Sequence, residues 1–472
     1  MSETTTPSNE QVHKVPLKVL VDKEKNKVLF VETGKDFVDV LLSFLTLPLG
    51  TITRLVAEES NMQPVKVGSV SSLYEKMLLH PRNSLESYCQ HLKLNIDNTE
   101  PTKYFLCANY NCNRKQSGSL FSIFRNQRCS CGKQINRIVS PENSTLENGF
   151  VKETATFITC DDLSELPNVL GTIVDLLRKL GVKDMDAIEE QTVDISKREV
   201  VDLLKLSLLS KTPLTDFIIE KKQYVENFNP INQFRSEIGE ESSDEGRQMV
   251  LKVLVRKSNK KILFAEAEED FADFLFSFLT FPLGGVLHML KGSSSLSCID
   301  KLYKSMIESS SDRYLKSQGL KDKFSNPPCA PQFNLSNQIL PIGEACLPMY
   351  YCCTYYAGGK YCLALVISPK PSCSTYDKNV RLDIVDPKSC IGNSSSYGGF
   401  VKGPSMYMVT DDLVVTPMSS ISGVTHLNKL QVSLFDLEEK VISIGLKEGL
   451  CILKASLTST STLTDALKHF LK

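Results

Sequence analysis

Four cysteines in the first third of the chain have the clearest chemical potential. Cys107 and Cys112 are separated by four residues, and after a loop of sixteen residues Cys129 and Cys131 are separated by one. Two close pairs joined by a short loop can bring four thiolates onto one tetrahedral ion, and Zn²⁺ prefers this soft ligand set. The spacing therefore predicts one zinc ion per chain, bound by Cys107, Cys112, Cys129 and Cys131.

The surroundings of these cysteines bear on the role of the zinc. Buried free thiols are the alternative, because cysteine is common in protein cores. The cysteines lie among polar residues such as Asn109 and Asn113, which favours metal binding. Gly132 follows the second pair and would relieve the backbone of a tight knuckle. Four cysteine ligands leave no coordination position open, so the pattern predicts a structural rather than a catalytic zinc.

The same segment carries cations and aromatic rings, with no Asp or Glu between residues 103 and 137. Cations contact phosphates and rings stack on bases, so binding of RNA or single-stranded DNA is one hypothesis. The alternative is that the cations offset the negative charge of a zinc site with four thiolates and form a solvated face. We favour this alternative because the chain as a whole is not basic. The candidate nucleic-acid contacts are Arg114, Lys115, Phe121, Phe124, Arg125, Arg128, Lys133 and Arg137.

Signals for catalysis are sparse. The six histidines are scattered, and the chain has no glycine-rich phosphate loop and no nucleophile elbow. The aspartate pairs at 161–162 and 411–412 could supply acid–base chemistry. Asp at a strand end more often forms a turn or caps a helix, so we favour a structural role for both pairs. No catalytic residue is predicted, and an enzyme with a site between two modules stays an alternative.

The elements that must position these residues occur twice. Leu17–Gly50 aligns without a gap with Leu251–Gly284, and 21 of the 34 positions are identical. In each copy two β-type runs flank a polar turn, which is typical of a β-hairpin. Apolar residues at helical spacing follow and predict a buried helix. In the first copy we expect Thr33 to be the N-cap of this helix and Pro48 to end it.

Later motifs extend the duplication to whole modules. Gly149-Phe-Val-Lys152 returns as Gly399-Phe-Val-Lys402, and Leu214-Thr-Asp216 returns as Leu463-Thr-Asp465. The predicted fold class is α+β, with two homologous modules in tandem. Each module contains a β-hairpin, helices and a small sheet, and the first adds a zinc-ribbon-like knuckle. Only the first module carries the cysteine tetrad.

Composition sets the boundaries of these modules. Residues 1–16 are rich in Thr, Ser and Asn and predict a disordered tail. Residues 228–247 include an acidic stretch rich in Ser and Gly, which predicts a solvated linker. The first module then spans residues 17–227 and the second spans residues 248–472. A chain of 472 residues with 42% apolar content can bury two substantial cores.

Charge and hydropathy exclude several classes of protein. The net charge of −1 gives no global attraction to nucleic acid or to an anionic membrane. No run approaches the roughly 18 apolar residues that span a bilayer, and the N-terminus has no apolar signal segment. We therefore expect an intracellular protein of the cytoplasm or nucleus. We expect reduced or metal-bound cysteines, no membrane partner, and a protein partner rather than nucleic acid.

Several short motifs are spread over both modules. They are Lys18-Val-Leu-Val21, Phe44-Leu-Thr-Leu-Pro-Leu-Gly50, Met77-Leu-Leu-His-Pro-Arg82, Lys103-Tyr-Phe-Leu-Cys107, Cys129-Ser-Cys-Gly132, Met408-Val-Thr-Asp-Asp-Leu413 and Pro417-Met-Ser-Ser420. Together they resemble a plant family known as "domain of unknown function 674", and the resemblance covers nearly the whole chain. It implies a plant origin, a duplicated domain and a cysteine cluster, without an assigned activity. Compared with the family pattern, the first copy is shortened between Tyr74 and Met77, where a longer helical stretch would be expected.

These observations lead to one functional hypothesis and two alternatives. The absence of catalytic constellations, together with a duplicated apolar unit, favours a non-enzymatic binding or scaffold protein with one structural zinc. A nucleic-acid-binding protein that uses residues 103–137 is the first alternative. An enzyme with a site between the modules is the second.

Overall fold

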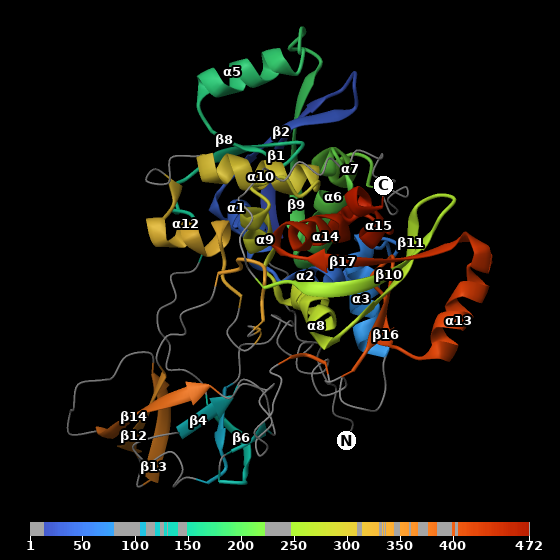
Figure 1. The fold of residues 1–472 in the computed structure, drawn as a ribbon. Helices are drawn as coiled ribbons and strands as arrows, with labels where there is room; N and C mark the ends of the chain where they lie inside the picture. The colour runs from blue at the N-terminus through green and yellow to red at the C-terminus, as the bar shows by residue number, and fades with distance from the viewer. Residues whose placement is uncertain are drawn as a thin grey trace, which may run out of the picture.

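The structure is a computed structural model of a mixed α+β protein with three β-sheets (Figure 1). The predicted linker, apart from Arg247, and residues 1–13 of the predicted tail lie outside the described residues, so the module boundaries stay predictions. The described residues are 14–79, 104–109, 119–122, 127–129, 131–139, 149–221, 247–308, 314–329, 333, 335, 337–343, 350–357, 360–366, 376–384, 399–401 and 405–471.

Each module contains a five-stranded antiparallel sheet with the same strand order, and the hairpin predicted from the duplicated stretch lies at its centre. In the first module the order is β8-β7-β2-β1-β9, and in the second it is β16-β15-β11-β10-β17. The strands are β1 (Lys14–Asp22), β2 (Lys27–Thr33), β7 (Phe157–Cys160), β8 (Glu165–Pro167) and β9 (Ile188–Ser196), then β10 (Met249–Arg256), β11 (Lys261–Ala267), β15 (Tyr407–Thr410), β16 (Val415–Pro417) and β17 (Leu437–Ile444).

The helices also correspond between the modules. In α1 the predicted apolar stripe is buried, and Pro48 interrupts the helical path as expected. The first module has α1 (Lys35–Thr46), α2 (Leu49–Arg54), α3 (Gly68–Leu79), α5 (Leu170–Lys179), α6 (Lys197–Leu209) and α7 (Pro213–Ile218). The second has α8 (Glu269–Ser277), α9 (Leu283–Met289), α10 (Ser297–Glu308), α12 (Gln318–Ser325), α13 (Ser420–Lys429), α14 (Leu446–Thr458) and α15 (Thr462–Ala466).

A third sheet is built from both modules, whereas the sequence predicted a separate small sheet in each. Its order is β13-β12-β14-β4-β3-β6-β5, and it lies apart from the helical core (Figure 1). The two contributions join where β14 pairs with β4 in parallel, and all other pairings recorded in this sheet are antiparallel. The strands are β3 (Tyr104–Cys107), β4 (Ser119–Ser122), β5 (Gln127–Arg128), β6 (Gln134–Val139), β12 (Tyr350–Ala357), β13 (Lys360–Val366) and β14 (Tyr376–Ile384).

The modules meet through reciprocal backbone contacts between equivalent residues. The N–H of Leu49 donates to the carbonyl of Phe281 at 3.0 Å, and the N–H of Leu283 donates to the carbonyl of Leu47 at 2.9 Å. Leu283 is the counterpart of Leu49 in the duplicated stretch, and Phe281 is the counterpart of Leu47. Pro48 and its counterpart Pro282 form an isolated bridge between these two bonds. The two modules are therefore related by an approximate twofold axis at this point.

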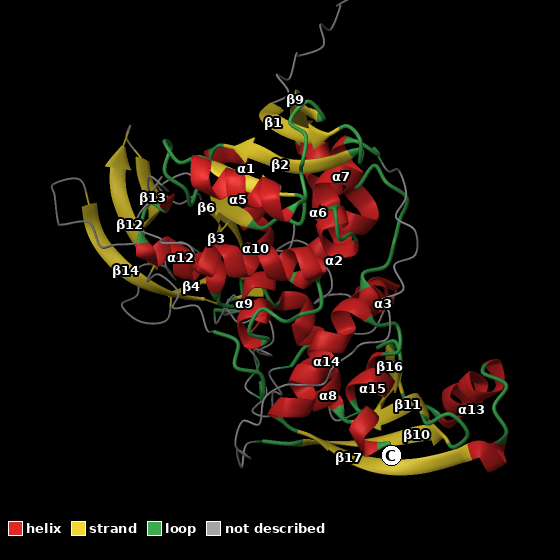
Figure 2. Ribbon diagram, turned by 90° about the horizontal axis from the view of Figure 1, so that it is seen from above, coloured by secondary structure: helices red, strands yellow, loops and turns green. Residues whose placement is uncertain are grey.

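Around this axis the modules exchange a helix. Helix α3 of the first module packs on α14 of the second, and α10 of the second packs on α6 of the first (Figure 2). The hydroxyl of Ser69 donates to the carbonyl of Ser459 at 2.8 Å, and the thiol of Cys298 donates to the carbonyl of Ser210 at 3.2 Å. The largest apolar cluster consequently contains residues of both modules. The exchanged helices therefore join the apolar cores of the two modules into one.

Two local predictions also need correction. Gly34, not Thr33, is the N-cap of α1, because the Thr33 hydroxyl lies 3.1 Å from that of Thr159 inside the sheet. Residues 14–16 belong to β1 rather than to a disordered tail, since they pair with β9. The described parts of α3 and α10 end at Leu79 and Glu308, so the shortening of the first copy after Tyr74 stays a prediction.

The helix exchange makes Gly68 a sensitive position. Its φ is +49°, and a Cβ atom there would lie 2.3 Å from the carbonyl oxygen of Ser456 in α14. We expect Gly68→Ala to force α3 away from α14 and to lower the free energy of unfolding by about 2–4 kcal/mol. Denaturant unfolding measures the effect. Gly171→Ala is the control, because no atom lies within 4 Å of that site in α5. Equal stability of the two variants would contradict the exchanged packing.

Candidate metal centre

Three of the four predicted cysteine ligands lie together in the third sheet. The Sγ atoms of Cys107, Cys129 and Cys131 are all within 4.8 Å of one another, and those of Cys107 and Cys131 are 3.5 Å apart. A tetrahedral zinc ion with Zn–S bonds of about 2.3 Å holds its sulfurs roughly 3.8 Å apart. The three thiols therefore have the separation that such an ion needs. Cys112 lies outside the described residues.

Local hydrogen bonds explain why these sulfurs converge. Cys107 ends β3 and pairs with Ile135 of β6, so it lies beside the turn that precedes β6. Within this turn the N–H of Gly132 donates to the carbonyl of Cys129 at 2.8 Å, and the N–H of Cys129 donates to the carbonyl of Lys133 at 2.8 Å. Gly132 has a φ of +81°, which confirms the tight turn expected at this glycine.

Two of the cysteines belong to a small apolar cluster in this sheet. Among the described residues it contains Phe105, Cys107, Cys129 and Ile135, while Cys131 is exposed. Burial, with the neighbouring thiols Cys131 and Cys129, raises the pKa of Cys107 to about 12, although the N–H of Asn109 opposes this shift. The thiol therefore stays protonated near neutral pH unless a cation is present to stabilise the thiolate. A divalent ion with sulfur affinity would supply that charge.

The basic residues of this segment do not all share one surface. Arg128 and Lys133 are exposed on either side of the cysteine turn, while Arg137 is partly buried. The side chain of Phe121 is only 2% exposed, so the expectation that it could stack on a base is wrong. The other candidate contacts, Arg114, Lys115, Phe124 and Arg125, lie outside the described residues.

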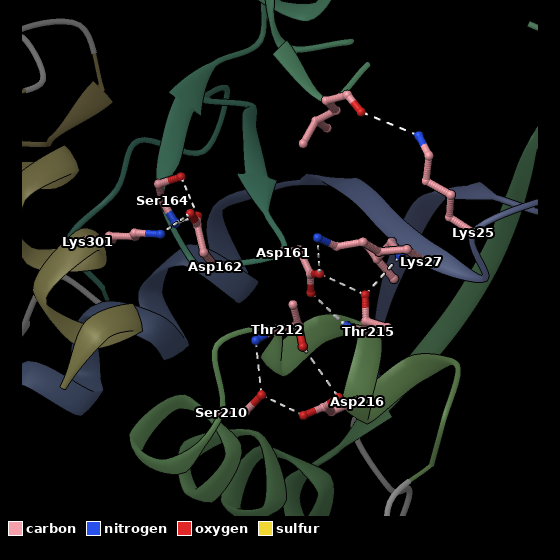
Figure 3. Close-up of polar contacts among 12 residues, drawn as sticks. Lys25, Lys27, Asp161, Asp162, Ser164, Ser210, Thr212, Thr215, Asp216 and Lys301 are labelled. Atoms are coloured by element: carbon pink, nitrogen blue, oxygen red, sulfur yellow. Dashed lines mark hydrogen bonds and ion pairs between the residues drawn. The ribbon is translucent and has the colours of Figure 1, made fainter. Parts of the chain in front are cut away.

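The aspartate pairs hold the fold together, as the sequence favoured (Figure 3). Asp161 accepts hydrogen bonds from the backbone N–H and the hydroxyl of Thr215 in α7, both at 2.8 Å. Asp162 accepts from Ser164 in its own turn and from Lys301 of the second module at 2.7 Å. In the second module Asp411 repeats the first role with the N–H of Thr464, at 2.8 Å.

The protonation of these carboxyls follows from their surroundings. Burial raises the pKa of Asp161, although the hydrogen bonds from Thr215 act to lower it. Burial also raises the pKa of Asp411, to about 6. Burial also opposes ionisation of Asp162, but the hydrogen bonds from Lys301 and Ser164 outweigh it and lower the pKa. Each carboxyl therefore has structural partners, and each anchors a turn, a helix start or the contact between modules.

A second duplicated carboxyl was missed in the sequence. Asp39 of α1 accepts the N–H groups of Phe150 and Val151 at 2.7 and 3.0 Å. Asp273 of α8 does the same for Phe400 and Val401, at 2.6 and 2.8 Å. This clamp explains the repeated Gly-Phe-Val-Lys motif, because a Cβ on its glycine would lie within 2 Å of the carboxylate. The available signal was that both aspartates are identical within the duplicated stretch.

Among the described residues, one cavity lies between the modules, and it is small. A cavity lined by residues of both modules, beside Gly68 and Ser295, has a volume of about 40 Å³. Ligand pockets are typically about 300–1,000 Å³, so it is too small for a substrate. A larger cavity of about 460 Å³ lies beside α6 within the first module. Asp202 on its wall is already bonded to Ser60 and Asn61.

A buried acid distinguishes the first module from the second. Glu165 accepts a hydrogen bond from the hydroxyl of Thr159 at 2.8 Å, and Thr159 contacts Thr33. Both threonines are fully enclosed, and Glu165 is 4% exposed. In the second module the corresponding positions are Ala267, Val409 and Val415, all of them apolar and buried. Burial raises the pKa of Glu165 from 4.5 to about 8.

This acid makes stability depend on pH. Between pH 4.5 and about 8 the folded protein keeps the proton of Glu165 while the unfolded chain loses it. The stabilisation is therefore complete below pH 4.5 and is lost as pH rises to about 8, at up to about 1.4 kcal/mol per pH unit. We expect Glu165→Gln to flatten this decline in denaturant unfolding measured across the range. Glu190→Gln, an exposed change on β9, should follow the parent; an unchanged slope in Glu165→Gln would contradict the assignment.

Comparisons with known proteins identify one matching family. A family model described as protein of unknown function (DUF674) matches residues 11–447. No curated protein and no solved structure matches the chain. Among the described residues, none of the helices has both the length and the apolar character that crossing a membrane requires.

Proposed function

Because the chain belongs to the DUF674 family, whose function is unknown, no activity follows from its membership, and we propose a non-enzymatic binding or scaffold protein with one structural zinc ion. The convergence of the sulfurs of Cys107, Cys129 and Cys131 within 4.8 Å carries this proposal. Cys112 would supply the fourth ligand. A closed set of four thiolates would hold the ion without leaving a position for substrate.

The position of the cluster supports a structural role for the zinc. It ties the end of β3 to the turn before β6, where the apolar core is a small satellite cluster. The same sheet receives β12, β13 and β14 from the second module through the short pairing of β14 with β4. Fixing β3 and β6 would therefore also stabilise the place where the two modules meet in this sheet.

The polar groups shared by the modules support a scaffold rather than an enzyme. Asp39, Asp161 and their counterparts are buried or half-buried and accept backbone N–H groups. Groups engaged in this way position helices and turns, and they are not directed at a cavity. The duplicated part of the chain is thus a structural framework, and its surface can bind partners.

Metal content tests the zinc site. We expect about one zinc per purified chain and none in the double variant Cys129→Ser/Cys131→Ser, because two ligands are lost. Elemental analysis by mass spectrometry measures this. Hydrogen exchange should rise in β3 and β6 of the variant while β1 and β10 stay protected. The control is Cys160→Thr, which copies Thr410 of the second module and should keep its zinc. A parent chain purified without zinc, and unable to take it up, would refute the proposal.

A second candidate function is binding of single-stranded nucleic acid beside the zinc. The observation in its favour is that Arg128 and Lys133 are both exposed next to the cysteine turn. The burial of Phe121 removes one of the two stacking residues first expected, which leaves phosphate contacts as the main attraction.

Fluorescence anisotropy with labelled single-stranded RNA tests this candidate. If it holds, affinity falls as salt rises, and Arg128→Ala/Lys133→Ala weakens binding about tenfold and lowers the salt dependence. Lys179→Ala/Lys183→Ala, two exposed residues near α5, is the charge-matched control. Binding that is absent, or equally weakened by both double variants, would remove this candidate.

A further inference from the structure

The connection between α13 and β17 presents large apolar side chains to solvent. Leu434 is 75% exposed and Phe435 is 92% exposed, and on the adjoining helix Ile421 and Val424 are 80% and 67% exposed. Single exposed apolar residues are normal, but two consecutive ones as exposed as Leu434 and Phe435 indicate an interaction surface. Figure 1 shows α13 at the outer edge of the molecule, away from the core. This surface therefore protrudes.

Hydrogen bonds hold these side chains outward. Residues 434–436 form one turn of 3₁₀-helix, and the hydroxyl of Ser433 accepts the N–H of Phe435. Asp436 accepts from Arg256 at 2.9 Å and from the backbone and hydroxyl of Ser258 at 2.8 and 2.7 Å. The turn is thereby fixed to the tip of the β10–β11 hairpin. Leu434 and Phe435 cannot fold back without breaking these bonds.

Cations surround the apolar pair. The hairpin tip contains Arg256, Lys257, Lys260 and Lys261 within six residues. Ion pairs join Arg256 to Asp436, Lys260 to Glu438 and Lys261 to Asp411. Lys257 instead donates to the carbonyl of Phe435 at 3.2 Å, and among the described residues it forms no ion pair. Residues 256–261 and 433–436, called the module-two tip below, are thus apolar at their apex and basic beside it.

We propose that the module-two tip docks on a membrane surface that contains anionic phospholipids. Leu434 and Phe435 would enter the boundary between headgroups and acyl chains, and Lys257 would meet the lipid phosphates. Lys260 would join it by exchanging its exposed ion pair with Glu438, at 3.4 Å, for a phosphate. A protruding apolar tip flanked by cations is complementary to a deformable anionic layer, whereas a protein partner would have to offer a cleft. The net charge of the chain led us to expect no membrane partner, but the charge at this tip is local.

The first module provides an internal comparison. By strand register Met185 corresponds to Leu434 and is 67% exposed, while Asp186 takes the place of Phe435. The corresponding hairpin tip carries Lys23, Lys25 and Lys27, but Asp22 and Glu24 lie among them. This tip is less apolar and nearly balanced in charge. It is therefore expected to contribute little to lipid binding, although its fold is the same.

Vesicle flotation with the full-length protein tests the proposal. We expect binding to phosphatidylcholine vesicles that contain phosphatidylserine, and little binding to phosphatidylcholine alone. Leu434→Ser/Phe435→Ser should weaken binding at least about tenfold through lost apolar insertion. Lys257→Gln/Lys260→Gln should weaken it at low salt and reduce its salt dependence. Met185→Ser, the matched change in the first module, should bind as the parent does.

Each contrary result is decisive. A parent protein that ignores phosphatidylserine vesicles would overturn the proposal and leave a protein partner as the occupant of the tip. Equal binding to both kinds of vesicle would exclude the role of the cations, and undiminished binding of Leu434→Ser/Phe435→Ser would exclude insertion. Thermal unfolding shows whether the variants are folded, since all the changed side chains are exposed. The proposal does not rest on the zinc site, so either can fail alone.

Discussion

The reciprocal contact at Pro48 and Pro282 is the constraint on which the rest of the structure depends. Each proline lacks an N–H group, and the residues on either side of it exchange backbone hydrogen bonds with their counterparts across the contact. Fixing the two modules at this point places α3 over α14 and α10 over α6, so that neither module encloses its own core. The lysine–aspartate contact between Lys301 and Asp162 then forms on the surface of the joined body. The cooperativity of folding should accordingly belong to the whole chain rather than to each half.

Local structure could be predicted from the sequence, whereas contacts between distant segments could not. The hairpins and the buried helix after each of them follow from periodicity and backbone preference, which act over a few residues. An apolar helix face indicates that the helix packs against another element, but it does not indicate which module supplies that element. The exchange of α3 and α10 could therefore not be predicted from the sequence. The shared third sheet was missed for the same reason, since strand pairing between distant segments leaves no mark on either segment alone.

The candidate site shows the same division. Three of the predicted sulfurs come together because Cys107 ends β3, and Cys129 and Cys131 lie in the glycine turn before the adjacent strand β6. The exposure of residues between the cysteines could not be predicted. Phe121 lies in a strand, and the alternation of side chains along a strand does not indicate which face of the sheet is covered. Thr33 failed as a helix cap because its hydroxyl is used by Thr159, a partner 126 residues away. Tertiary hydrogen bonds of this kind override a local capping preference.

The differences between the modules are more informative about function than their similarities. The carboxylates that anchor turns and helices are kept in both, whereas among the described residues the cysteine cluster, the buried Glu165 and the exposed Phe435 are each found in one module only. In a homodimer every change would appear twice, but two halves joined in one chain can diverge independently while they keep their mutual contacts. A framework that needs both halves to fold can then carry a cysteine cluster that could hold a metal ion in one half and an apolar tip flanked by cations in the other. Selection for binding, rather than for folding, would therefore act at the positions where the two modules differ.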